Sequence, residues 1–151
     1  MFKCFKKPKG KESFDIPMVL STVHEFTDLE LDVMELVNYH RREKGLRMLT
    51  FNFTLGNIAT PHAKGMAHHN KLTHSGFPIR NAQAMKYCKA TWLGEVVAYG
   101  YISAEGFLNG WLNSETHRRV IESERAVSFA ISIEANAKYR NYAILLMVDK
   151  K

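Results

Sequence analysis

The sequence predicts an α+β domain in which helices cover an antiparallel sheet. Apolar residues recur at helical spacing in two segments before residue 71 and in another that follows Ser103. From Arg125 onward the apolar period changes to two, and an almost wholly apolar run extends from Tyr142 to Val148. Helices first and a hairpin last are typical of the α+β class.

The composition indicates one domain. The chain has 151 residues, of which 46% are hydrophobic and 24% charged, as expected for a globular domain with a buried core. We expect a basic lead-in over residues 1–27 and a single domain over residues 28–151. The formal charge is +6, and residues 1–11 contain five lysines and no acid, which leaves +1 for the remainder. The basic charge therefore belongs to the N-terminal segment.

That basic segment, residues 1–11, is typical of a solvated, mobile terminus, because its apolar surface is too small to offset the entropy of ordering. The alternatives are weak contact with an anionic membrane surface, a nucleic acid or a larger assembly. We predict no site for the specific recognition of a nucleic acid. Residues 8–30 lack the apolar core of a secretory signal, and no segment is long enough to cross a bilayer. We therefore expect one of three cases: a protein that is cytosolic as synthesised, a mature form from which the signal has been removed, or a component released by lysis.

The helical elements follow in order. Asp28 is a candidate N-cap for a first helix that Gly45 ends. A short extended link precedes a second helix, from Thr54 to about Asn70. Pro61 lies inside it and should either kink the helix or place its true start later in the chain. Residues 71–92 have no sustained periodicity and indicate mostly loop, with room for a helical turn around residues 82–88.

The second half contains two more helices and the hairpin. Ser103 can cap a third helix that stops near Asn113, and Ser114 can cap a further short one. The alternating strand that begins near Arg125 should be half-buried, and the apolar strand from Tyr142 should be central. The two cysteines, at positions 4 and 88, are too few for a disulfide framework, so Cys88 is expected to fill apolar space.

Three polar residues stand at the ends of predicted elements, where side chains can converge. They are His74, Glu95 and His117. Imidazoles with a carboxylate can hold zinc and leave coordination positions for water. By spacing alone, surface or capping roles explain these residues better than a shared site does. His62, on the apolar stripe of the second helix, is expected to be a hydrogen-bonded core residue.

Four motifs occur in the order found in a known family. They are residues 36–46 (LVNYHRREKGL), 62–67 (HAKGMA), 94–100 (GEVVAYG) and 111–118 (WLNSETHR). This ordered set resembles the CAP superfamily, also called the SCP domain, which comprises cysteine-rich secretory proteins, antigen 5 and pathogenesis-related proteins. The closest resemblance is to bacterial SCP-like members, and it covers most of the chain.

The resemblance implies an α-β-α sandwich with a central antiparallel sheet flanked by helices, and a cleft lined by two histidines and two acids. By motif these are His74, Glu95 and His117. The second acid is uncertain, because Ser114 stands at its place in the eukaryotic pattern and Glu115 is the nearest carboxylate. The sequence departs from the family at Val96, where asparagine is usual, and in lacking its disulfides.

Three functions follow as hypotheses. The first is a binding module whose cleft holds a divalent metal such as zinc, or a small ligand, and whose surface engages an unknown protein or lipid. The second is a structural or attachment component of an envelope or phage particle, with the basic segment as its docking element. The third is a zinc-assisted hydrolase with Glu95 as general base. An enzyme is the less favoured class, and relatives are usually secreted.

Overall fold

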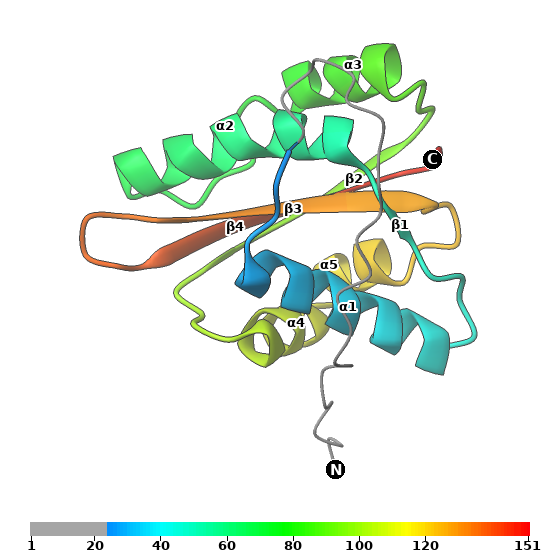
Figure 1. The fold of residues 1–151 in the computed structure, drawn as a ribbon, viewed down its shortest axis with the longest axis horizontal. Coiled ribbons are helices and arrows are strands. Elements are labelled where there is room, and N and C mark those ends of the chain that lie inside the picture. Colours follow the sequence, from blue (N-terminus) through cyan, green and yellow to red (C-terminus); the bar gives the residue numbers. More distant parts are fainter. Residues whose placement is uncertain (1–23) are drawn as a thin grey trace.

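The computed structural model describes residues 24–151, so most of the predicted lead-in lies outside the described residues. Along the chain the elements are α1 (Asp28–Glu43), β1 (Thr50–Phe51), α2 (Phe53–His69), α3 (Phe77–Tyr87), β2 (Leu93–Tyr99), α4 (Ala104–Leu112), α5 (Glu115–Ile121), β3 (Ser128–Ala135) and β4 (Asn141–Val148). Figure 1 shows the sheet between two helical layers, with α2 and α3 on one face and α1, α4 and α5 on the other. The α+β class and the sandwich are confirmed.

The sheet has the strand order β1-β3-β4-β2. β4 is antiparallel to both of its neighbours, as the predicted hairpin requires. β1 is the exception to the antiparallel pattern, because Thr50 and Phe51 pair in parallel with the start of β3. The expected central antiparallel sheet is therefore correct for β2, β3 and β4, with one short parallel strand at the edge.

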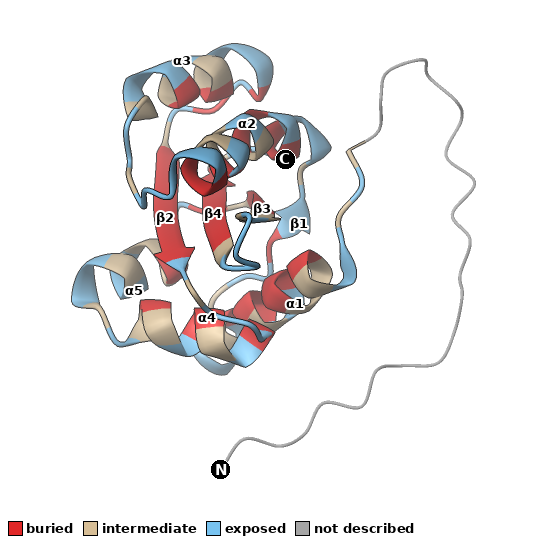
Figure 2. Cartoon of the chain, turned by 90° about the vertical axis from the view of Figure 1, so that its left-hand side faces the viewer, coloured by how far each residue is buried: buried red, intermediate tan, exposed pale blue. Residues whose placement is uncertain are grey.

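Each face of the sheet has its own apolar core. Leu145 and Met147 of β4 pack with the α1, α4 and α5 layer, whereas Ile144 and Leu146 pack with the α2 and α3 layer. Successive side chains of a strand point to opposite faces. A strand covered on both faces buries side chains at successive positions, which explains the unbroken apolar run of residues 142–148. Figure 2 shows β2 and β4 buried between the helices.

The start of α1 corrects one prediction. Thr27, rather than Asp28, is the N-cap, and it forms a capping box with Glu30. The Thr27 hydroxyl accepts from the Glu30 amide at 3.2 Å, and the Thr27 amide donates to Glu30 Oε1 at 2.8 Å. Glu30 Oε2 also accepts from the Ile133 amide at 2.7 Å. Glu30 thus both caps the helix and attaches it to β3, a dual role that favours the earlier cap.

α3 corrects a larger error, because residues 71–92 were predicted to be mostly loop. Pro78 lies in the first turn of this helix, where a missing amide hydrogen costs nothing, since the first amides of a helix have no partner within it. Gly76 precedes it with a φ of +80°, a left-handed conformation that favours glycine. The glycine and proline therefore begin a helix instead of forming a loop.

Both flanking strands are also more buried than the pattern suggested. β3 was expected to be half-buried, yet Ser128 and Ser132 on its polar face are buried against the helices. Small side chains at these positions let α2 approach the sheet closely. β2 was not predicted as a strand, although its residues 93–98 are all buried. The helix predicted from Thr54 begins at Phe53, capped by Asn52, and continues through Pro61.

Candidate functional site

Glu95 is the centre of the candidate site. β2 directs its carboxylate to the face covered by α2 and α3, and the side chain is only 2% exposed. Oε2 accepts from Arg80 Nε at 2.7 Å, and Oε1 accepts from Arg80 Nη2 at 2.9 Å. Oε1 also accepts from His74 Nδ1 at 2.8 Å. A buried carboxylate needs such partners because its charge is costly to remove from water.

Arg80 uses every hydrogen of its guanidinium group. Besides the two bonds to Glu95, Nη1 donates to the Ser75 carbonyl at 2.8 Å and to His62 Nδ1 at 3.1 Å. Nη2 donates to the His74 carbonyl at 3.1 Å. Since arginine has five donors, none remains for another ligand. Arg80 therefore holds the His74 loop and the Glu95 carboxylate in one arrangement.

The hydrogen bonds of His62 determine its tautomer. Nε2 lies 2.6 Å from the Thr73 carbonyl, which only accepts, so Nε2 carries the hydrogen. Nδ1 is then the acceptor for Arg80. Burial lowers the pKa of His62 and so favours the neutral ring; the hydrogen bond to Thr73 opposes this shift and the charge of Arg80 adds to it. His62 is thus hydrogen-bonded, as predicted, but it is half-buried rather than part of the core, and it also supports the site.

His74 is the residue of this arrangement that is exposed to solvent. Its Nδ1 hydrogen is directed at Glu95, and its side chain is 54% exposed. The second ring nitrogen, Nε2, is therefore the atom left for a ligand. We define the Glu95 cluster as His62, His74, Arg80 and Glu95, which come from α2, the loop before α3, α3 and β2.

His117 lies on α5, which packs against β2 at the residue before Glu95. Burial lowers its pKa, and the charge of nearby His74 lowers it further, so the two imidazoles influence each other electrostatically. Gly94 permits this approach: a Cβ atom there would lie 2.8 Å from Val120 Cγ1 of α5 and 2.7 Å from the Trp92 ring. The glycine before Glu95 therefore lets α5 pack closely against β2.

The other two predicted site residues lie apart from the Glu95 cluster. The exposed Glu115 accepts from Arg119 Nη2 at 2.6 Å, one turn along α5. Ser114 is the N-cap of α5, as predicted, but its side chain forms no capping bond. Neither residue bonds to the cluster in the part of the chain described. No group of three or more histidine, cysteine, aspartate or glutamate side chains within residues 24–151 is arranged to hold a metal ion.

Arg80 is the site residue that the sequence reasoning missed. It lies in a segment interpreted as loop, and a single arginine has no periodic signal. The one available indication was its position four residues after Gly76, on the first turns of what proved to be a helix. His62 and Arg80 also line a cavity of about 520 Å³ between α2 and α3, together with Ile58, Ile79 and Tyr87.

Comparisons with known proteins agree with this fold. The model of the family described as "CAP: Cysteine-rich secretory protein family" matches residues 34–148. The uncharacterized membrane protein YlbC of Bacillus subtilis is 23% identical over 119 residues, which are 77% of this chain and 34% of that protein. The chain spans about a third of the length of the curated relatives it matches. No helix among residues 24–151 has the length and apolar character needed to span a membrane.

Solved structures extend the similarity to the whole domain. An outer surface protein from Borrelia burgdorferi aligns with a TM-score of 0.71 at 20% identity, over 83% of this chain and 97% of that one. An extracellular protein containing an SCP domain from Bacillus anthracis aligns with a TM-score of 0.68 at 20% identity, over 80% of this chain and 40% of that one. With a family match over residues 34–148, the chain belongs to the cysteine-rich secretory protein, or CAP, family.

Proposed function

We propose that this domain is a binding module whose site at His74 and His117 takes a divalent metal ion such as zinc. The observation that supports it best is the hydrogen bond from His74 Nδ1 to the buried carboxylate of Glu95. Metal-binding histidines commonly donate their other ring hydrogen to a carboxylate, which orients the ring and raises its basicity. Glu95 is itself held by Arg80, so the orientation of His74 is determined by buried groups.

The state of the rings also suits this role. A metal ligand must be a neutral imidazole, and the lowered pKa of His117 favours that form near neutral pH. His74 is the exposed member and offers Nε2. Two imidazoles make an incomplete ligand set for zinc, so water or atoms of a bound ligand would complete the coordination. Such a site is suited to exchangeable binding rather than to a closed structural metal.

The same geometry gives the hydrolase hypothesis less support. A general base must be free to take a proton from water. Both oxygens of Glu95 already accept hydrogen bonds, two from Arg80 and one from His74. Glu95 would have to break a buried ion pair before it acted as a base. Its arrangement is that of a positioning residue for His74.

Calorimetric titration of zinc into the chelator-treated protein tests the proposal. We expect one-to-one binding that is lost in both His74→Ala and His117→Ala. In Glu95→Gln we expect affinity to fall by roughly 10- to 100-fold, because the hydrogen-bond partner of a metal-binding histidine typically contributes that much. Circular dichroism of each variant checks that the domain is folded.

Two matched controls make the titration specific. His68 and His69 form an exposed pair at the end of α2 that can chelate zinc adventitiously. The variant His68→Ala/His69→Ala should therefore leave the one-to-one binding intact, as should Glu115→Gln. Binding that disappears with His68 and His69 but survives the loss of His74 or His117 would refute the proposed site.

A further inference from the structure

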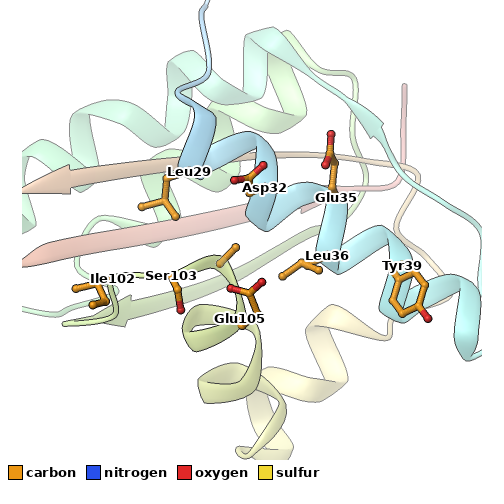
Figure 3. Close-up of a pocket in the computed structure, with 9 residues that line it drawn as sticks. Leu29, Asp32, Glu35, Leu36, Tyr39, Ile102, Ser103 and Glu105 are labelled. Atoms are coloured by element: carbon orange, nitrogen blue, oxygen red, sulfur yellow. The ribbon is translucent and has the colours of Figure 1, made fainter. Parts of the chain in front are cut away.

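A groove between α1 and the start of α4 is separate from the Glu95 cluster and lies on the other face of the sheet. Its volume is about 370 Å³. Figure 3 shows its side chains coming from α1 on one side and from Ile102, Ser103 and Glu105, around the start of α4, on the other. The apolar part of the lining includes Leu29, Leu36 and Ile102. Ile102 is 85% exposed, although such a side chain is usually covered.

Three carboxylates line the same groove. They belong to Asp32, Glu35 and Glu105. Within residues 24–151 none of the three forms an ion pair or a hydrogen bond through its side chain, whereas the carboxylates of Glu95 and Asp149 are both paired. Apolar side chains beside unpaired acids suit an occupant that has both cationic and apolar groups. They disfavour anionic ligands such as fatty acids or phosphates.

The chain contains a segment of this chemistry. Residues 1–11, which lie outside the described residues, have the sequence MFKCFKKPKGK, with five lysines, two phenylalanines and no acid. We propose that the groove between α1 and α4 binds this N-terminal basic segment of the same chain. The lysines pair with Asp32, Glu35 and Glu105, and the phenylalanines cover the apolar lining.

The path of the chain permits this docking. The described residues enter α1 at Thr27, and the groove begins beside Leu29, near the start of the same helix. Residues 12–23 can span at most about 40 Å when fully extended, whereas the stretch of α1 from Leu29 to Tyr39 is about 15 Å long. The connection also makes binding intramolecular, so even a weak contact benefits from an effective concentration of roughly millimolar.

Native Cys4 allows the proposal to be tested in the full chain. A thiol is introduced in the groove by Ile102→Cys, and in a control protein on the opposite layer by Lys64→Cys, at an exposed position of α2. Under mild oxidation we expect the internal disulfide with Cys4 to form at least about tenfold faster in the Ile102→Cys protein. The buried Cys88 is a poor competitor. Peptide mapping after proteolysis identifies the disulfide.

Charge reversal tests the contribution of the acids. Adding Glu35→Lys/Glu105→Lys to the Ile102→Cys protein should remove the rate advantage, and high salt should reduce it by screening. The matched control Glu43→Lys/Glu124→Lys changes the net charge equally at exposed acids outside the groove and should leave the rate unchanged. Equal rates for the two introduced thiols would overturn the proposal. Disulfide-linked dimers in place of the internal disulfide would also overturn it, and would assign the groove to the segment of a second copy.

Discussion

Two arginines are buried in this domain, on opposite faces of the sheet, and their partners differ. Arg80 is 6% exposed and Arg41 is 0% exposed. Arg80 pairs with a carboxylate and orders two histidines around it. Arg41 has only carbonyl partners: Nε donates to Arg47 O, and Nη1 donates to Ile121 O and Ser123 O, each at 2.9 Å. Its Nη2 has no partner among the described residues.

The difference separates a structural role from a site-building role. The carbonyls that Arg41 bonds lie just past α1 and at the end of α5, where a cation is favourable because helix carbonyls there lack partners. Arg41 thereby joins two chain segments, and its side chain pairs with no acid or histidine. Arg80 connects buried groups to the exposed ring of His74. The partners of a buried arginine, rather than its burial, therefore indicate whether it contributes to a site.

The largest expected effect comes from breaking the Arg80 pair. Arg80→Met leaves the Glu95 carboxylate buried with His74 as its remaining partner. Because an unpaired buried charge is costly, we expect the free energy of unfolding to fall by about 3 kcal/mol. Urea denaturation measures this change. The double variant Arg80→Met/Glu95→Gln should recover much of the loss, since it removes the charge that Arg80→Met leaves unpaired. A double variant as unstable as the sum of the single variants would contradict this coupling.

A smaller loss is expected when the other arginine is replaced. Arg41→Met removes three hydrogen bonds and should lower the free energy of unfolding by about 2 kcal/mol. The loss is moderated because burial, and then the neighbouring charge of Arg47, already lowers the pKa of Arg41 and disfavours its charged form. Zinc titration of this variant should match the wild type. A change in zinc affinity would show that the two arginines are not separate in function.

The smallest effect concerns pH. Burial lowers the pKa of His62 from an ordinary value of 6.5, so below pH 6.5 the unfolded chain binds more protons there than the folded domain does. The stabilising contribution of the neutral ring is complete above pH 6.5 and is lost as the pH falls. The free energy of unfolding should thus decline less steeply between pH 6.5 and 5 in His62→Gln than in the wild type. Urea denaturation at each pH measures this decline. If the free energy of unfolding falls equally steeply in both proteins, His62 does not contribute to its pH dependence.

Much of the fold was predictable because its signals are local. The helices α1, α2, α4 and α5 and the hairpin of β3 and β4 follow from apolar spacing and capping residues over short stretches of chain. The errors arose where one local signal had two meanings. Gly76 and Pro78 suit a loop as well as the beginning of α3, and the serines of β3 suit a solvated face as well as a close helix contact.

The candidate site was predictable only in part. His74, Glu95 and His117 were selected by family resemblance, and the structure places His74 in direct contact with Glu95. Whether these residues bind metal remains a prediction. The role of Arg80 was not predictable, because it depends on a carboxylate that lies 15 residues later in the chain and on another strand. Glu115 remains a prediction as the second acid, with its carboxylate bonded to Arg119 at the surface.

The sequence by itself determined the α+β class, most helix positions, the hairpin and the separation of a basic segment from a nearly neutral domain, because periodicity, capping and charge are properties of short segments. Only the tertiary structure decided which face of β2 presents Glu95, which arginine holds it, and where unpaired acids meet apolar side chains between α1 and α4. Those outcomes depend on contacts between segments far apart in the chain, and such contacts form only when the helices pack on the sheet.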